Sequence, residues 1–117
     1  MNENKNGVQY STPIILPEQK VLIEWLDYNG HMNVAYYTLA FDKSLDIFLE
    51  DFLGIGETHA YENNQGPFVV QAHYHYLSEM KLDEKFNVRL FVVDCEKKKM
   101  HICLEIFSQL QEKVIAV

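Results

Sequence analysis

One short stretch of the chain concentrates side chains that can do chemistry. The sequence Asp27-Tyr28-Asn29-Gly30-His31-Met32-Asn33 places a carboxylate, an imidazole and two carboxamides within seven residues. Asp27 could serve as a nucleophile or as a general base toward water, while Asn29 and His31 orient the reacting groups. The same residue types also form turns in which polar side chains merely satisfy backbone groups. Spacing alone does not choose between these two interpretations.

A long helix is predicted to follow this stretch. Apolar side chains recur at spacings of 4, 4, 3 and 4 residues in Tyr37, Phe41, Leu45, Phe48 and Phe52, which is the pattern of one helix face over about 18 residues. Asn33 is a suitable N-cap, and Gly54 and Gly56 end the pattern. Backbone N–H groups near residues 33–35, or those of a partner subunit, would then be free to hold an oxyanion or polarise a carbonyl group beside Asp27.

The remaining patterns predict strands. Residues 20–25 are expected to form a first strand, and residues 57–67 are expected to be irregular. Further strands are predicted over 68–77, 86–94, 100–109 and 114–117, with a hairpin turn at 96–99. The core faces expected on three of them are Val70, Ala72, Tyr74 and Tyr76; Phe86, Val88, Leu90 and Val92; and Met100, Ile102, Leu104 and Ile106. This order predicts an α+β fold in which an antiparallel sheet wraps around one helix.

Length and composition limit the protein to one domain. The chain has 117 residues and a net charge of −7, which disfavours nucleic acid and anionic membrane surfaces as partners. We expect a flexible segment at 1–17 and a single domain over 18–117. No stretch approaches the roughly 18 apolar residues of a membrane span. Cys95 and Cys103 do not make a disulfide framework, so we expect a reducing, cytoplasmic location.

Residues 25–37 resemble the signature of hot-dog-fold thioesterases, in which an Asp-x-Asn-x-His-x-Asn turn leads into a long helix that carries a tyrosine. The form of the turn is similar to that of acyl-ACP thioesterases and of bacterial acyl-CoA thioesterases in the 4-hydroxybenzoyl-CoA thioesterase superfamily. The resemblance implies hydrolysis of an acyl thioester, with Asp27, Asn29 and His31 as catalytic residues. The candidate substrate-binding residues are then Asn33, Tyr36 and Tyr37.

Glu79 is a second catalytic candidate. The sequence Tyr76-Leu77-Ser78-Glu79-Met80 resembles a Tyr-x-x-Glu-Cys stretch of the acyl-ACP branch, whose glutamate is implicated in catalysis. Met80 stands where that branch has cysteine, so no cysteine-dependent mechanism is expected here. The alternative for Glu79 is a solvated charge at a strand end.

Other polar features are interpreted as structural. His73 and His75 share one strand face and could belong to a metal site, but the sequence offers no third ligand, so we expect no metal. Lys97-Lys98-Lys99 is expected to be a solvated hairpin turn, with contact to the phosphates of a CoA as the alternative. Cys95 and Cys103 are expected to be packing residues.

Three functions remain open at this point. The first is hydrolysis of an acyl-CoA or acyl-ACP thioester; the second is an acyl-thioester dehydratase or hydratase of the same fold; the third is a non-catalytic module that binds acyl-CoA. The resemblance implies a homodimer or a dimer of dimers with sites at the interface, and no metal or prosthetic group, since CoA is part of the substrate. The chain ends in the apolar run Val114-Ile115-Ala116-Val117. Either the last strand is unusually short or the chain is a truncated form of a longer protein, and we favour truncation because a bare apolar end invites aggregation.

Overall fold

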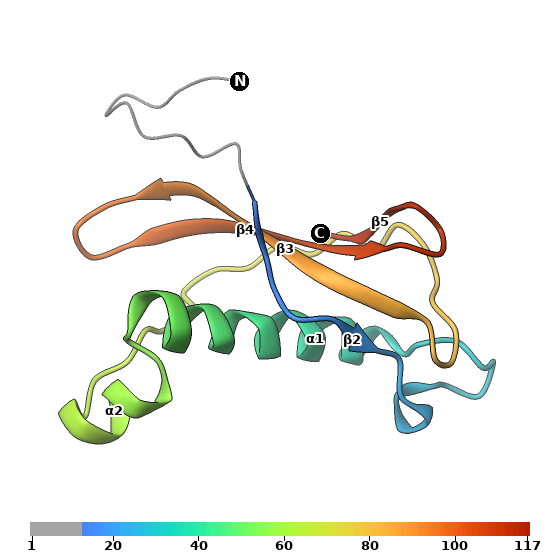
Figure 1. Ribbon diagram of the computed structural model, residues 1–117, viewed down its shortest axis with the longest axis horizontal. Coiled ribbons are helices and arrows are strands. Elements are labelled where there is room, and N and C mark those ends of the chain that lie inside the picture. Colours follow the sequence, from blue (N-terminus) through green and yellow to red (C-terminus); the bar gives the residue numbers. More distant parts are fainter. Residues whose placement is uncertain (1–12) are drawn as a thin grey trace.

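The computed structural model describes residues 13–117. Its strands are β1 (Ile14–Ile15), β2 (Gln19–Lys20), β3 (Lys85–Cys95), β4 (Met100–Ser108) and β5 (Lys113–Ala116). Its helices are the 3₁₀ turn η1 (Ile23–Trp25), the long helix α1 (Val34–Ile47), the π-helix η2 (Phe48–Leu53) and the short helix α2 (Glu57–Asn63). The predicted α+β arrangement is present, with α1 lying along one face of an antiparallel sheet (Figure 1).

The sheet is built on the long hairpin of β3 and β4. These strands pair in register from Phe86 with Ser108 to Cys95 with Met100, with an irregularity between Val92 and Asp94. The other edge of β3 pairs with both β1 and β2, and β5 follows β4 to give the order β1-β3-β4-β5. The hairpin turn predicted at 96–99 is confirmed by a hydrogen bond from Glu96 N to Lys99 O at 2.7 Å.

The helix begins and ends where the sequence predicts. The side chain of Asn33 caps α1 by accepting a hydrogen bond from Ala35 N, which satisfies one of the N–H groups that a helix start leaves unpaired. The helical path continues from α1 into η2 and ends at Gly54, whose φ of 69° is left-handed, a conformation that glycine adopts without steric cost. Gly56 does not extend this ending, because it is the N-cap of α2.

Alternate residues of the hairpin face α1 and form the core. Phe86, Val88, Leu90 and Ile106 are fully buried, together with Ala40, Phe41 and Phe48 from the helical side. Val92, Ile102 and Leu104 are partly buried against the same cluster. Met100 was expected to face the core, but it is 40% exposed, because it lies at the hairpin end beyond the reach of the helix.

Three local predictions are corrected. Residues 20–25 form no continuous strand: β2 stops at Lys20 and the 3₁₀ turn η1 follows, which lets Val21 and Trp25, four residues apart, both be buried. The 57–67 segment, which we expected to be irregular, contains helix α2. The sequence did not predict this helix because its residues make no apolar stripe. We expected the domain to begin at residue 18, but Ile14 and Ile15 already pair with β3 as part of the sheet. Residues 1–12 of the expected N-terminal segment lie outside the described residues.

Residues 68–77 do not form the regular strand that their alternation predicts. Only their last part is held, through hydrogen bonds of His75 with Val117 and of Leu77 with Ile115 and an isolated bridge between Tyr76 and Ala116. All four residues of the predicted core face are exposed, Val70 to 81%, Tyr74 to 41% and Tyr76 to 45%. Tyr74 and Tyr76 still contact Phe41 and Tyr37 of the helix with one side of their rings. A strand needs a hydrogen-bonding neighbour along its length, and within the described residues the first half of this segment has none.

Candidate active site

The polar stretch at 27–33 forms a tight turn closed by Asp27. Oδ1 of Asp27 accepts hydrogen bonds from the backbone N–H groups of Asn29 at 2.8 Å and His31 at 3.2 Å. The backbone closes the same loop, since Asp27 N donates to His31 O at 2.8 Å and Gly30 N to Asp27 O at 3.0 Å. Gly30 has a φ of 78°, which explains a glycine at this point of the turn. The capped turn that the sequence allowed is therefore present, and Oδ2 of Asp27 has no protein partner among residues 13–117.

The structure brings Glu79 to this turn. His31 forms a β-bridge with Lys81, and Met32 N donates to Met80 O at 2.9 Å. This antiparallel contact places Nδ1 of His31 3.4 Å from Oε2 of Glu79. The side chain of Glu79 is 64% exposed and that of His31 is half-buried, so the pair lies at the surface and both groups can reach a ligand.

The start of α1 lies beside the same turn. Asn33 N donates to Trp25 O at 2.8 Å and Ala35 N to Oδ1 of Asn33 at 2.9 Å. Of the three N–H groups expected to be free at 33–35, only that of Val34 lacks an acceptor among the described residues. It is an available donor at the positive end of the helix dipole.

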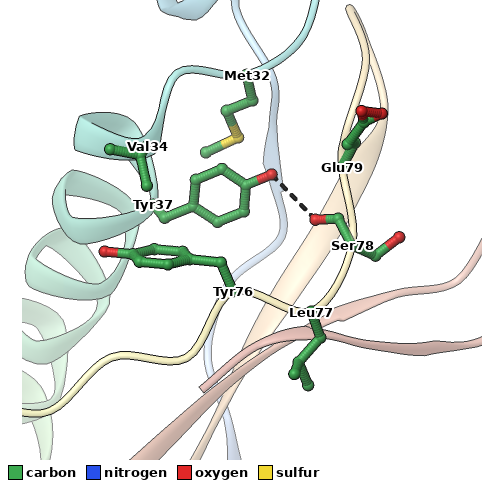
Figure 2. Close-up of a pocket in the computed structure, with 7 residues that line it drawn as sticks. All are labelled: Met32, Val34, Tyr37, Tyr76, Leu77, Ser78 and Glu79. Carbon is green, nitrogen blue, oxygen red and sulfur yellow. Dashed lines mark hydrogen bonds between the residues drawn. The ribbon is translucent and has the colours of Figure 1, made fainter.

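A pocket of about 310 Å³ opens between the start of α1 and residues 76–79. Figure 2 shows Val34 and Tyr37 on the helix facing Tyr76, with Met32 above the ring of Tyr37 and the hydroxyl of Tyr37 donating to the carbonyl oxygen of Ser78. The rings of Tyr37 and Tyr76 meet edge to face, with centroids 5.5 Å apart. The complete lining is Met32, Val34, Tyr37, Tyr76, Leu77, Ser78 and Glu79.

Tyr37 keeps its proton in this environment. Burial raises the pKa of its hydroxyl, and the negative charges of Glu79, Glu84 and Asp27 act in the same direction, against a hydrogen bond with the Met80 backbone that lowers the pKa. The phenol is therefore a neutral hydrogen-bond donor at physiological pH, and the site around it is acidic.

The predicted site residues fall into two groups. Glu79 lines the pocket and pairs with His31, whose backbone N–H donates to Asp27. Asn33 and Tyr37 belong to the helix start, where Tyr37 forms part of one pocket wall. Tyr36 points elsewhere: its ring stacks on Trp25, with centroids 5.7 Å apart, and it does not line the pocket. Asn29 is exposed and contacts Asp27 through its backbone N–H. The sequence did not indicate Met32, Val34 or Leu77 as pocket residues, because an apolar side chain carries no signal that separates a pocket wall from a core.

The other polar candidates remain peripheral. His73 and His75 are exposed, and the described residues contain no cluster of three or more side chains able to hold a metal ion. Cys103 is half-buried and unpaired, and burial, with the charge of Glu105, raises the pKa of its thiol, which makes it a poor nucleophile. Lys97, Lys98 and Lys99 are exposed at the hairpin tip. No helix within residues 13–117 is long and apolar enough to cross a membrane.

Comparison with known families decides the class of this protein. Residues 21–117 match the family model of the thioesterase-like superfamily. The chain belongs to this superfamily. The match includes both the turn at 27–33 and Glu79, so the candidate site lies wholly inside the family domain.

Curated proteins named as betainyl-CoA thioesterases are among the relatives of this thioesterase-like domain. A betainyl-CoA thioesterase of Pseudomonas aeruginosa is 31% identical over 85 residues, which cover 73% of this chain and 53% of that protein. An L-carnitine dehydrogenase/betainyl-CoA thioesterase of Rhizobium meliloti is 30% identical over 110 residues, which cover 91% of this chain and 21% of that protein. The chain thus spans about half of the first relative and a smaller part of the second.

Solved structures share the fold. A Staphylococcus aureus protein in complex with CoA superposes with a TM-score of 0.81 at 24% identity, covering 93% of this chain and 68% of that one. A DHNA-CoA thioesterase from Staphylococcus aureus gives a TM-score of 0.77 at 16% identity, covering 90% and 68%. The predicted hot-dog fold, an antiparallel sheet around one long helix, is confirmed.

Proposed function

We propose that this domain hydrolyses an acyl-CoA thioester to a free acid and CoA. The observation that carries the proposal is that His31 pairs with Glu79 through its ring and contacts Asp27 through its backbone N–H, just before α1, while Glu79 lines a pocket of about 310 Å³. The superfamily match and two relatives named as betainyl-CoA thioesterases support the same reaction.

The chemistry follows from the groups at the pocket mouth. Asp27 has two possible roles. In the first it attacks the thioester carbonyl carbon, the C–S bond breaks to release CoA, and water hydrolyses the resulting acyl-Asp27 anhydride to the free acid and the regenerated carboxylate. In the second it takes a proton from the water that attacks the carbonyl carbon. In the second route the water oxygen bonds to the carbonyl carbon, the C–S bond breaks, and the sulfur leaves as the CoA thiolate, which then takes up a proton. In the proposed step the N–H of Val34 donates to the developing oxyanion. Asn29 and His31 orient the reacting groups, and Glu79 is a second acid or base. No metal or prosthetic group takes part.

The pocket chemistry favours a small cationic acyl group. Its walls include the rings of Tyr37 and Tyr76 and the carboxylate of Glu79, and no lysine or arginine. Aromatic faces and a carboxylate attract a quaternary ammonium group. This agrees with the substrate named for the relatives, so betainyl-CoA is the substrate we propose, with CoA rather than ACP as the carrier.

Thiol release from a panel of acyl-CoAs tests the proposal. The panel contains betainyl-CoA, its neutral isostere 3,3-dimethylbutanoyl-CoA, in which carbon replaces the quaternary nitrogen, a medium-chain acyl-CoA, an aromatic acyl-CoA and an enoyl-CoA. We expect release to be fastest with betainyl-CoA. Water addition to the enoyl-CoA without free thiol would instead identify a hydratase, and tight binding without release from any member would identify a binding module.

We further propose a homodimer, with a dimer of dimers as the larger form. Residues 68–77 expose Phe68, Val69 and Val70 next to the pocket-lining residues 76–79. The first half of that segment lacks a hydrogen-bonding neighbour among the described residues, so the same segment of a second copy can pair with it and continue the sheet. Such pairing would place two pockets at the interface. The unpaired thiols of Cys95 and Cys103 fit a cytoplasmic location.

A further inference from the structure

Gln111 lies outside the turn at 27–33 and the lining of the pocket, and yet it contacts the backbone of Glu79. We propose that Gln111 is a positioning residue, which holds residues 78 and 79 so that the carboxylate of Glu79 meets His31. The proposal rests on the proposed function, since it assigns Gln111 a part in the same site.

The side chain of Gln111 bridges three residues of the neighbouring segment. It extends from the turn between β4 and β5, and its Nε2 donates to the carbonyl oxygen of Glu79 at 2.9 Å and to Oε2 of Glu84 at 2.6 Å. Its Oε1 accepts a hydrogen bond from Oγ of Ser78 at 2.9 Å. Both donor hydrogens of the amide and one acceptor site are thereby used, so the side chain has one well-defined orientation.

Gln111 is itself fixed by buried groups. Its backbone N–H donates to Oγ of Ser108 at 3.1 Å, and that hydroxyl donates to Oε2 of Glu84 at 2.7 Å. Ser108 is fully buried and Glu84 is 8% exposed. The other oxygen of Glu84 accepts from Lys81 N at 3.1 Å. Hydrogen bonds to a buried carboxylate are strong and directional, so this network ties the turn to residues 78–84.

The anchored segment carries the groups that form the site. The carbonyl oxygen of Ser78 accepts a hydrogen bond from the hydroxyl of Tyr37. Oε2 of Glu79 lies 3.4 Å from Nδ1 of His31. A largely exposed glutamate gains little from a surface ion pair and would otherwise sample many rotamers. Anchoring of its own carbonyl by Gln111 limits where the carboxylate can lie. Misplacement of a reacting group by about 1 Å can cost about 100-fold in rate.

Gln111→Met in the full chain tests the proposal, because methionine keeps the length of the side chain and removes its three hydrogen bonds. The matched control is Gln109→Met, since Gln109 lies in the same turn, is exposed and makes no side-chain hydrogen bond within the described residues. We expect kcat for the best acyl-CoA to fall about 10- to 100-fold in Gln111→Met, with KM changed far less, and to stay unchanged in Gln109→Met. If Gln111→Met does not fold, Gln111→Asn, whose amide is one methylene shorter, takes its place.

A double-mutant cycle separates positioning from general support of the fold. If Gln111 acts through Glu79, Gln111→Met has little further effect on kcat in the Glu79→Gln background. An equal loss in both backgrounds, or an unchanged kcat in the single variant, would overturn the proposal.

Amide hydrogen exchange tests the positioning role of Gln111 without an activity assay. Met32 N donates to Met80 O, so its exchange reports the contact between the turn at 27–33 and the anchored segment. We expect exchange at Met32 to rise about tenfold in Gln111→Met relative to Gln109→Met, with Leu90 in the β3–β4 hairpin as the internal reference. If the wild type releases no thiol from any acyl-CoA, the proposed function is wrong. Unchanged exchange at Met32 in Gln111→Met would reject the positioning role of Gln111, whatever the activity.

Discussion

Nδ1 of His31 lies 3.4 Å from Oε2 of Glu79. The two residues are far apart in the chain and come from different segments, the turn before α1 and the segment that leads to β3. The bridge of His31 with Lys81 and the hydrogen bond from Met32 N to Met80 O hold these segments together. The catalysis that we propose therefore depends on a tertiary contact, and each group in it can be tested separately from the fold.

Asp27→Asn should abolish most of the hydrolysis and leave the turn intact. Asparagine keeps an Oδ1 that can accept from the N–H groups of Asn29 and His31, but it lacks the charge needed for nucleophilic or general-base action. We expect thiol release to fall by about 10² to 10⁴ with little change in Tm. Asp27→Ala also loses the two hydrogen bonds, so its Tm should fall. Turnover near that of the wild type in Asp27→Asn would remove Asp27 from the mechanism.

Glu79→Gln should lower kcat at little cost in stability. The pair with His31 is exposed, and such pairs contribute at most about 1 kcal/mol to folding. If Glu79 acts as an acid or base, kcat falls about 100-fold or more. The control is Glu96→Gln, which removes another exposed pair, with Lys99 at 4.0 Å, at the distant hairpin tip. Equal activities for the two variants would make Glu79 an ordinary surface charge.

Asn33 has a capping role that substitution can separate from substrate binding. Asn33→Ala removes the acceptor for Ala35 N and should cost about 1 kcal/mol of unfolding free energy. Asn33→Asp keeps the acceptor and should retain the stability of the wild type, as measured by urea unfolding. A raised KM in Asn33→Asp at unchanged stability is the result expected if the amide also contacts substrate. Equal stability of the Ala and Asp variants would contradict the cap.

Tyr37 should make stability sensitive to alkaline pH. Its pKa is raised in the folded state, first by burial, so the folded protein retains the phenolic proton when the unfolded chain, with a tyrosine pKa of about 10, begins to lose it. The unfolded state then binds fewer protons, and the unfolding free energy falls as the pH rises above about 10. We expect a smaller fall in Tyr37→Phe over the same range. Parallel pH profiles for the two proteins would show that Tyr37 makes no such contribution.

Val70→Lys should break the proposed dimer without unfolding the chain. Val70 is exposed in a segment that we propose to pair with its copy, and a lysine there would place like charges across the interface. We expect sedimentation to give at least twice the chain mass for the wild type and half of the wild-type mass for the variant. Val93→Lys, at an exposed position near the hairpin end, should remain a dimer. A monomeric wild type would contradict the proposed pairing.

The sequence by itself determined the local elements whose signals are local. The spacing from Tyr37 to Phe52 defined the helix, Asn33 its start and Gly54 its end, because helix periodicity and caps depend on residues a few positions apart. The alternation in β3 and β4 likewise predicted their hairpin and most of its buried face. The density of polar groups from Asp27 to Asn33, together with the resemblance that it carries, pointed to the superfamily.

Only the tertiary structure decided which of these groups meet. The residues around Glu79 in the sequence do not indicate that His31 is its neighbour. Those of the turn after β4 do not indicate that Gln111 contacts the backbone of Glu79. Both contacts join segments that are distant in the chain. Residues 68–77 show the converse: their alternation predicts a strand, but a strand also needs a neighbour that supplies hydrogen bonds, and within the described residues only its end has one. Side-chain pattern is a local property, whereas pairing and the geometry of a site arise from the packing of distant segments.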